Sequence, residues 1–134
     1  MYTYETSIKL HNTDAAGLLF YADQFYLAHD AYESFMEDVG MNFARIIKST
    51  DFLVAIIRAE ADFKEQLYVG ERLRINVRAE KIGKTSFILA YDIKNVEGDS
   101  VGLVRTVHVC IDKEKRKKKK LPDKLRKALE TIIK

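Results

Sequence analysis

The sequence predicts an α+β fold in which an antiparallel sheet curls around one long helix. Residues 22–39 repeat apolar side chains at steps of three and four, which is the period of a helix with one buried face. From residue 52 to residue 111 apolar and polar side chains alternate between short turns, which is typical of a meander of strands. One sheet and one strongly apolar helix must bury each other, so we expect the sheet to wrap the helix.

The N-terminal elements follow from local composition. Residues 2–10 alternate loosely and are rich in β-forming residues, which predicts a first strand, and the small polar residues His11–Gly17 predict a loop. Asp23 suits the first turn of the long helix and Gly40 suits its C-terminal cap, and residues 42–48 predict a short helical turn. The expected buried face of the long helix consists of Phe25, Ala28, Tyr32, Phe35, Met36 and Val39.

The second half of the chain predicts strands and one more helix. Four strands are expected: the apolar run 52–57 with the alternating stretch 58–64, then 72–80, 86–94 and 101–111. In segment 72–80 Leu73, Ile75, Val77 and Ala79 share one face, and in segment 86–94 Phe87, Leu89, Tyr91 and Ile93 do so. Leu121-Pro122-Asp123 opens a final helix, with an apolar stripe of Leu125, Ala128, Leu129, Ile132 and Ile133.

Composition limits the class of protein. The 134 residues, 47% hydrophobic and 32% charged, suit a single globular domain over residues 1–134, without repeats or linkers. The single cysteine, Cys110, excludes an intramolecular disulfide and favours a reducing cytoplasm. The N-terminus lacks the pattern of a signal peptide, and the longest apolar runs, 15–22 and 52–57, are too short to cross a bilayer. We therefore expect a cytoplasmic protein with no membrane partner.

Charge and metal-ligand spacing exclude two further classes. From Lys113 onward eleven Lys and Arg stand against three Asp and Glu, so the tail carries +8 and residues 1–112 carry −5. The run Lys115–Lys120 is typical of a solvated loop, and no aromatic residues interleave it, so we expect no nucleic-acid partner. His11, His29, His108 and Cys110 match no metal-ligand spacing, and His108 and Cys110 share one strand face, as core residues do.

The segment most suited to chemistry is Asn12–Ala22. One carboxylate, Asp14, stands in a loop of small residues just ahead of the long helix. The apolar residues that follow are expected to desolvate it partly, which makes a carboxylate a stronger base or nucleophile. Free N–H groups at the helix start favour a developing oxyanion, so the pair suits acyl transfer. A turn-forming role for Asp14 is the alternative.

The run Asn12-Thr13-Asp14-Ala15-Ala16-Gly17-Leu18-Leu19-Phe20-Tyr21 resembles the signature of hotdog-fold acyl-CoA thioesterases of the 4-hydroxybenzoyl-CoA type. That signature is an aspartate followed by Ala-Gly and then a Tyr or His at the helix start. The resemblance extends over nearly the whole chain and includes Ile82–Phe87 and Leu121-Pro122. It implies the hotdog fold, a curved antiparallel sheet around a central helix, and a thioester hydrolase. A thioester is already activated and coenzyme A is part of the substrate, so we expect no metal and no cofactor.

The resemblance also implies roles for particular residues. Asp14 is the catalytic nucleophile or general base, and the backbone N–H near Tyr21 polarises the thioester carbonyl. The residues implied to bind substrate and coenzyme A are Gly17, Lys81, Lys84, Thr85 and Ser86. Sites of this family lie between two subunits, so we expect a homodimer, and dimers that pair again into a homotetramer. Ile88 and Ala90 offer apolar surface for such contacts.

Tyr21 and the Thr-Asp-Ala-Ala-Gly run narrow the implied substrate. Members that act on short aliphatic chains or on acyl carrier protein often carry His at the position of Tyr21. Tyrosine resembles the aryl-CoA members, and Thr13–Gly17 resembles the hydrolases of 1,4-dihydroxy-2-naphthoyl-CoA. We expect hydrolysis of an aromatic acyl-CoA to the free acid and coenzyme A. The alternatives are a thioesterase for short-chain acyl-CoA or acyl carrier protein, and a non-catalytic acyl-binding hotdog protein.

The basic run at 115–120 suggests a role in substrate capture. Coenzyme A carries a diphosphate and a 3′-phosphate, which the acidic body of the protein repels. If this loop reaches the mouth of a site, on its own subunit or on a neighbour, it raises the encounter rate. The alternative is a solvated loop that only aids solubility.

Overall fold

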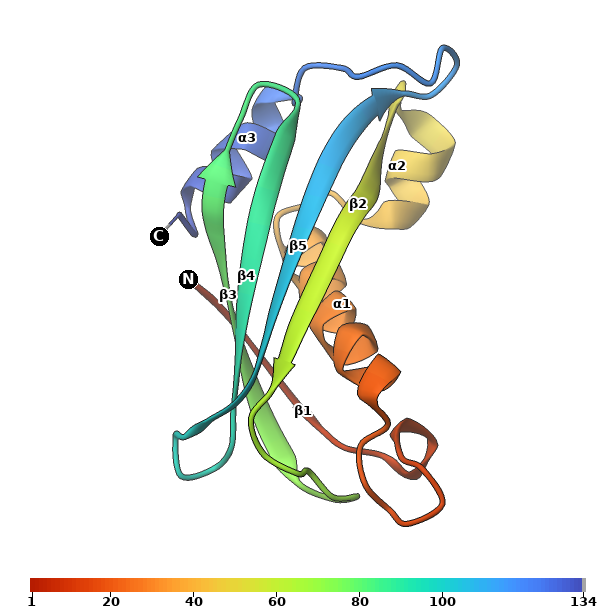
Figure 1. Ribbon diagram of the computed structural model, residues 1–134. Coiled ribbons are helices and arrows are strands. Elements are labelled where there is room, and N and C mark those ends of the chain that lie inside the picture. The colour runs from red at the N-terminus through yellow and green to blue at the C-terminus, as the bar shows by residue number, and fades with distance from the viewer. Residues whose placement is uncertain (134) are drawn as a thin grey trace.

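The computed structural model describes residues 1–133, in which a five-stranded antiparallel sheet curls around helix α1 (Figure 1). The elements are β1 (Tyr2–Ser7), the 3-10 helix η1 (Leu10–Asn12), α1 (Tyr21–Asp38), α2 (Phe43–Ser49), β2 (Phe52–Phe63), β3 (Arg72–Ile82), β4 (Ser86–Lys94), β5 (Ser100–Asp112) and α3 (Asp123–Glu130). The strand order is β1-β3-β4-β5-β2, so β1 and β2 form the two edges. The expected α+β arrangement is confirmed.

The core lies between α1 and the concave face of the sheet. All inward residues predicted for β3 and β4 are buried, namely Leu73, Ile75, Val77, Ala79, Phe87, Leu89, Tyr91 and Ile93. From α1, the predicted residues Ala28, Tyr32, Phe35 and Met36 are buried with them, while Phe25 and Val39 are partly buried. Burying one large apolar side chain contributes roughly 1.5–3 kcal/mol, so this contact fixes the helix on the sheet.

Three local features differ from the expected elements. The first strand ends at Ser7, because the chain turns into η1, where the Asn12 side chain accepts the N–H of Lys9 at 2.9 Å. The run 52–57 and the stretch 58–64 form one strand, β2, as expected, but a β-bulge that the pattern did not predict lies between Ile56 and Arg58. The final helix ends at Glu130, so of its last two predicted apolar residues Ile132 is buried and Ile133 is exposed.

A buried amide ties the first turns of α1 to the sheet. The Gln24 side chain is 1% exposed, and its Nε2 donates to the carbonyl oxygens of Asp62 on β2 (3.0 Å) and Leu103 on β5 (3.2 Å). Gly102 makes room for this amide, since a Cβ there would stand 2.9 Å from Gln24 Nε2. The position of the helix start relative to two strands therefore depends on one side chain and one glycine.

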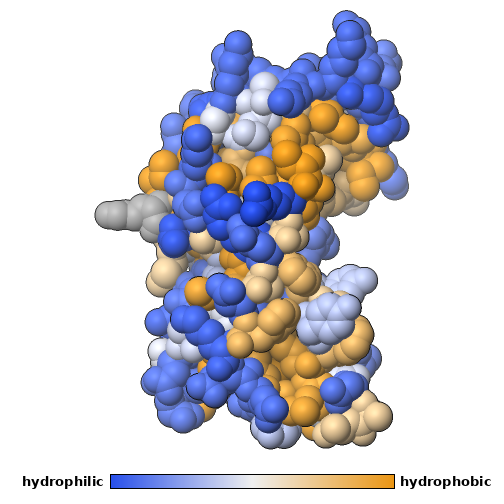
Figure 2. Space-filling model, in the orientation of Figure 1, coloured by the Kyte–Doolittle hydropathy of each residue, from blue (hydrophilic) through white to orange (hydrophobic). Residues whose placement is uncertain are grey.

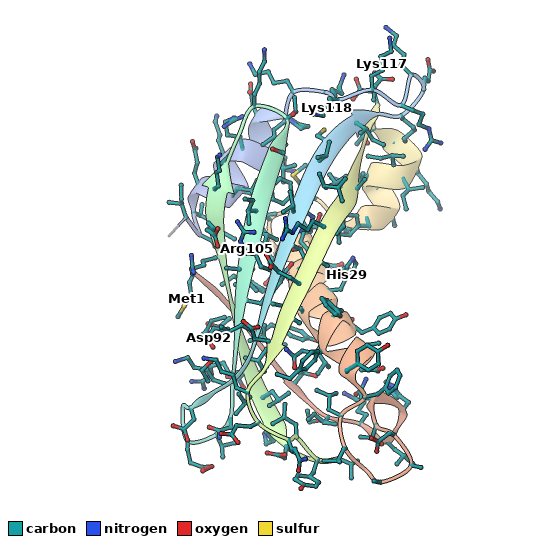
Figure 3. All side chains as sticks on the ribbon, viewed as in Figure 1. Met1, His29, Asp92, Arg105, Lys117 and Lys118 are labelled. Carbon is teal, nitrogen blue, oxygen red and sulfur yellow. The ribbon has the colours of Figure 1, made fainter. Side chains whose placement is uncertain are left out.

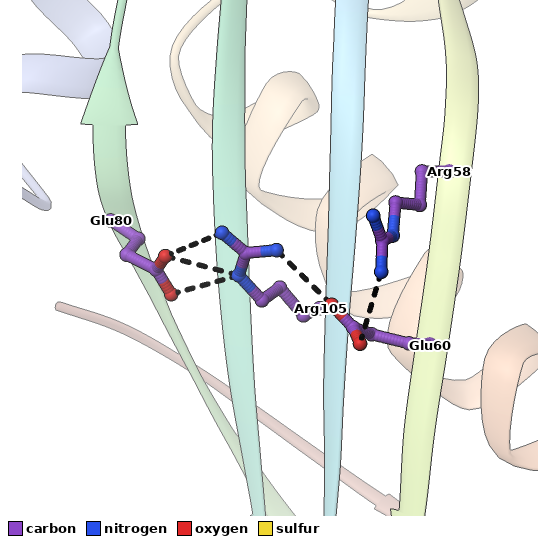
Figure 4. Close-up of polar contacts among 4 residues, drawn as sticks. All are labelled: Arg58, Glu60, Glu80 and Arg105. Carbon is purple, nitrogen blue, oxygen red and sulfur yellow. Dashed lines mark hydrogen bonds and ion pairs between the residues drawn. The ribbon is translucent and has the colours of Figure 1, made fainter.

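The outer face of the sheet carries an ion-pair network at its centre (Figure 4). Arg105 on β5 lies opposite Ala90 on β4, whose small side chain lets the guanidinium reach Glu80 on β3 at 2.8 Å. The same guanidinium contacts Glu60 on β2 at 3.1 Å, and Arg58 lies 3.8 Å from Glu60. The hydrogen bond from Arg105 lowers the pKa of Glu80. The network thus links β2, β5 and β3, and reaches across β4, on the face opposite the core.

His108 lies in the core as expected for a packing residue. Its Nε2 is 2.7 Å from Thr106 Oγ1, which in turn lies 3.1 Å from the Tyr91 hydroxyl, and its ring stacks on Phe87 at 4.6 Å. Among the described residues, His108 Nδ1 and the Tyr32 hydroxyl are buried without a hydrogen-bond partner. Burial, with a smaller contribution from His29, lowers the pKa of His108 to about 3. The histidine is therefore neutral in the folded protein.

Within residues 1–133 no helix combines the length and apolar character needed to span a membrane.

The contact between Gln24 and Gly102 predicts a coupled stability effect. Gly102→Ala should lower the free energy of unfolding by ~1–3 kcal/mol, because the new methyl group overlaps a side chain that two hydrogen bonds hold in place. In a Gln24→Ala background the same glycine substitution should cost far less. Urea denaturation of the four proteins at one concentration measures this coupling. An equal cost in both backgrounds would contradict it.

Buried His108 predicts a loss of stability in acid. Below its ordinary value of 6.5 the unfolded chain binds a proton that the folded chain excludes down to about 3. The free energy of unfolding should therefore fall with decreasing pH in this window, by up to ~1.4 kcal/mol per pH unit from this group. His108→Gln should remove that part of the slope in urea denaturation, and the exposed-site control His11→Gln should retain it. Equal slopes for wild type and His108→Gln would refute the assignment.

Candidate active site

The predicted catalytic loop is a tight turn that leads back to the start of α1. Asp14 N–H donates to the carbonyl oxygen of Leu18 at 2.8 Å, and Phe20 N–H donates to that of Asn12 at 2.9 Å, so the chain doubles back on itself. Gly17 closes the turn with φ +79°, in the left-handed region that favours glycine. Its N–H donates to the Asp14 carbonyl at 3.1 Å. Gly17 thus has a structural role at the position where substrate binding is expected.

The two oxygens of the Asp14 carboxylate differ in their hydrogen bonds. Oδ1 accepts the backbone N–H groups of Ala16 (2.9 Å) and Leu18 (3.1 Å), which is the turn-forming role. Oδ2 has no hydrogen-bond partner among the described residues, so one oxygen is fixed and the other is available for chemistry. The side chain is exposed, so the desolvation expected from the apolar residues after it does not occur within one chain.

The start of α1 presents unpaired donors. Phe20 occupies the N-cap and supplies no side-chain hydrogen bond, and within residues 1–133 the N–H groups of Tyr21 and Ala22 have no acceptor. These donors carry the positive end of the helix dipole and suit an oxyanion. The Tyr21 side chain is 65% exposed, and Phe20 beside it is also exposed. The local geometry thus brings Asp14, Gly17 and Tyr21 to one end of the sheet.

Asn12 and Asp23 hold the loop against the helix. Asn12 is buried, and its Nδ2 donates to Asp23 Oδ2 in the first turn of α1 at 3.0 Å. Asp23 therefore does more than match the helix dipole, since it also anchors the chain that precedes Asp14. The role of Asn12 was not predicted. A polar residue two positions before the candidate catalytic aspartate was the only sequence signal for it.

The connection between β2 and β3 supports the other side of the loop. Leu19 N–H donates to the Leu67 carbonyl at 2.8 Å, and Val69 N–H donates to the Gly17 carbonyl at 3.0 Å. Leu67 is buried, whereas Tyr68 and Val69 are exposed beside the loop. Exposed apolar side chains therefore lie beside the loop of Asp14.

The remaining predicted substrate residues lie at the other end of the sheet. Lys81 is near the end of β3, and Lys84, Thr85 and Ser86 form the turn into β4, which packs beside the end of β5 through a bond from Cys110 N–H to the Thr85 carbonyl at 2.8 Å. β3 begins near the loop of Asp14 and runs away from it for 11 residues. One chain does not bring these four residues to Asp14.

Metal ligation has no geometric basis in the part of the chain that the structure describes, where no three His, Cys, Asp or Glu side chains gather. His29 pairs instead with Glu33 at 2.8 Å, and Cys110 is buried as a free thiol.

Known proteins resemble this chain in sequence. A model of the Thioesterase-like superfamily matches residues 8–129. A 1,4-dihydroxy-2-naphthoyl-CoA hydrolase from Nostoc punctiforme is 33% identical over 130 residues, which cover 97% of this chain and 87% of that protein. One from Thermosynechococcus vestitus is 30% identical over 122 residues, which cover 91% and 84%.

The fold comparison agrees. The crystal structure of a 1,4-dihydroxy-2-naphthoyl-CoA thioesterase from Synechocystis matches this chain with a TM-score of 0.90 and 30% identity, covering 96% of this chain and 94% of that one. The family expected from the motif around Asp14 is confirmed by these matches, together with the sheet that wraps α1. The chain belongs to the thioesterase-like superfamily of hotdog proteins.

Proposed function

We propose that this protein hydrolyses an aromatic acyl-CoA thioester, with 1,4-dihydroxy-2-naphthoyl-CoA as the substrate. Two relatives are named 1,4-dihydroxy-2-naphthoyl-CoA hydrolases. They are 30% and 33% identical to this chain, and each match covers more than nine-tenths of it. The observation that carries the proposal is Asp14, whose Oδ2 is free while Oδ1 is held, in a loop that ends at the unpaired N–H groups of α1.

Two routes use this arrangement, and both leave Asp14 in the central role. In the first, Oδ2 attacks the thioester carbon, the coenzyme A thiolate leaves, and water hydrolyses the resulting anhydride. In the second, Oδ2 takes a proton from the water that attacks the thioester carbon, and the coenzyme A thiolate leaves. In both, the carbonyl oxygen gains negative charge that the N–H groups of Tyr21 and Ala22 stabilise. The thioester is already activated, so neither route requires a metal or a redox cofactor.

We also propose that the working unit is a dimer joined at β2. This 12-residue edge strand exposes apolar side chains, with Ile57 64%, Phe63 51% and Ile56 41% exposed. Hydrophobic side chains gather along this edge in Figure 2. A long apolar edge of this kind is an aggregation hazard unless another strand covers it. A two-fold axis pairs two copies of β2 antiparallel and continues the sheet from one copy to the other.

In the proposed dimer the second subunit also covers Asp14 and Tyr21, which are exposed in one chain and need surroundings that exclude water. Pairing of dimers into a tetramer remains our expectation for the full assembly. A cytoplasmic location is proposed on the ground that Cys110 is a free buried thiol, so no disulfide supports the fold.

Asp14→Asn tests the catalytic assignment. The substitution keeps the size of the side chain and its acceptor oxygen but removes the charge, so kcat/KM should fall by at least ~10²-fold with little change in the free energy of unfolding. Asp99→Asn, in the exposed turn before β5, is the matched control and should retain full activity. The assay is a panel of aryl-CoA, aliphatic acyl-CoA and acyl-carrier-protein thioesters.

The outcomes of this panel separate the candidate functions. Preferred hydrolysis of aryl-CoA supports the proposal. Preferred hydrolysis of short aliphatic or carrier-bound acyl chains would instead assign one of those as the substrate class. A wild-type protein that binds acyl-CoA without hydrolysing any member of the panel is an acyl-binding protein. Activity of Asp14→Asn within a few-fold of wild type removes Asp14 from the mechanism.

Ile57→Lys tests the dimer. A charge on the bulged edge should prevent strand pairing, so sedimentation should show monomers, and kcat/KM should fall by at least ~10-fold. Val96→Lys places the same charge on another exposed apolar residue, in the turn between β4 and β5, and should leave both assembly and activity unchanged. A fully active monomer would overturn the proposal.

A further inference from the structure

The chain between β5 and α3 forms an ordered basic loop. Asp112 Oδ1 accepts the N–H groups of Glu114 (3.0 Å) and Lys115 (2.9 Å), and Asp112 N–H donates to the Lys117 carbonyl at 2.8 Å. Lys119 N–H donates to the Cys110 carbonyl at 2.9 Å, so the loop folds back along the end of β5. These hydrogen bonds hold the backbone of the loop in one conformation, which fixes where its side chains begin.

Most charges of this loop are uncompensated. Lys113 Nζ donates to the carbonyl oxygens of Ile46 and Ile47 at the end of α2, and Lys119 pairs with Asp51 at 3.3 Å. The other five basic residues are exposed and have no acidic partner among residues 1–133, and we call them the basic surface: Lys115, Arg116, Lys117, Lys118 and Lys120. Five like charges on one loop repel one another, so a polyanion that bound there would relieve this cost.

The basic surface adjoins the turn between β3 and β4. Leu121 N–H donates to the Lys84 carbonyl at 2.9 Å, so the residue after the basic surface is attached to this turn. Lys84 is itself exposed and adds a positive charge beside the basic surface. Figure 3 shows Lys117 and Lys118 at this end, where β4 begins and β5 ends.

The loop of the basic surface and the loop that precedes α1 lie at opposite ends of the sheet (Figure 1). Lys113 N–H donates to the Asp51 carbonyl beside the start of β2, whereas the loop of Asp14 packs on Leu67 just after the end of β2. The 12 residues of β2 between them span roughly 35–40 Å at ~3.3 Å per residue. An extended coenzyme A thioester is shorter than this distance, so the two features of one chain cannot hold the two ends of one substrate.

We propose that the basic surface of one copy of this chain binds the phosphates of an acyl-CoA whose thioester lies at Asp14 of a second copy. The inference rests on the proposed thioesterase activity and the β2 dimer. When two identical strands pair antiparallel about a two-fold axis, the start of each lies beside the end of the other. The basic surface lies beside the start of β2 and the loop of Asp14 lies beside its end, so each Asp14 site receives positive charge from the other copy.

A charge-removal variant tests the basic surface. It combines Lys115→Ser, Arg116→Asn, Lys117→Ser and Lys118→Ser, with Asn chosen because Arg116 has φ +60° and Asn tolerates that conformation. KM for aryl-CoA should rise by at least ~10-fold at low salt with kcat within about twofold, because the phosphates are remote from the scissile bond. The difference should disappear near ~1 M salt, where the screening length is ~3 Å.

A matched control removes four charges elsewhere. In the control, Ser replaces four basic residues of β3 and β4, namely Arg72, Arg74, Arg78 and Lys94. The net charge falls by as much as in the charge-removal variant, and KM should stay within about twofold of wild type. Binding of coenzyme A and of dephospho-coenzyme A to Asp14→Asn protein gives a readout without turnover. The charge-removal variant should lose affinity for both ligands, and the larger loss should be for the one that carries the 3′-phosphate.

Mixed dimers determine which copy supplies the charge. One subunit carries Asp14→Asn, the other carries the charge-removal variant, and two different tags isolate the mixed species. If the basic surface acts across the dimer, one site has both defects and the other has none, so KM is that of wild type and kcat is half. If it acts within its own chain, the only active site lacks the charges and KM is that of the charge-removal variant, which overturns the proposal.

The remaining outcomes are also decisive. An unchanged KM of the charge-removal variant at low salt, with an active wild type, overturns this inference and leaves the proposed function standing. A wild type that hydrolyses no acyl-CoA overturns the proposed function itself. Coenzyme A affinity in Asp14→Asn protein then reports separately whether the basic surface binds phosphates.

Discussion

The burial of α1 in the curve of the sheet is the contact on which the rest of the structure depends. Ala31, Tyr32, Phe35 and Met36 are fully enclosed by strands that come from distant parts of the chain. Because the helix is fixed along its length, its first N–H groups are fixed too, and Gln24 sets their place relative to β2 and β5. The site at the helix start is therefore a consequence of how the core packs, and it needs no further scaffold of its own.

The same packing leaves the site unfinished. Electrostatic stabilisation of an oxyanion is strongest where water is excluded, yet Asp14, Phe20 and Tyr21 are all exposed in one chain. The loop itself is well built, since Asn12 and Asp23 hold it on the helix and backbone donors fix Asp14 Oδ1. Under the proposed function, a single chain places the candidate catalytic groups, and the proposed dimer supplies the dry, charged surroundings in which they act.

Short-range patterns predicted most of the fold, because they report directly on burial. The alternation in β3 and β4 and the spacing in α1 gave the correct inward faces. Features that depend on distant partners were not predictable: Gln24 bonds to Asp62 and Leu103, 38 and 79 residues away. The bulge at Ile57 was not predicted either, because an extra residue in a strand leaves no distinctive pattern in the sequence. The motif located the loop of Asp14, but the exposure of its carboxylate depends on tertiary packing that a motif does not encode.

The two edges of the sheet differ in a way that limits growth of the assembly. β2 is long and apolar, whereas β1 has six residues, and the Tyr2 hydroxyl on it bonds Ser34 and Asp38 of α1. Joining two copies at β2 uses both long edges and leaves only the two short β1 edges at the ends of the combined sheet. The bulge in β2 also disfavours any pairing register that does not match it. The proposed dimer therefore limits its own growth, because it covers the exposed apolar edge that would otherwise favour fibres.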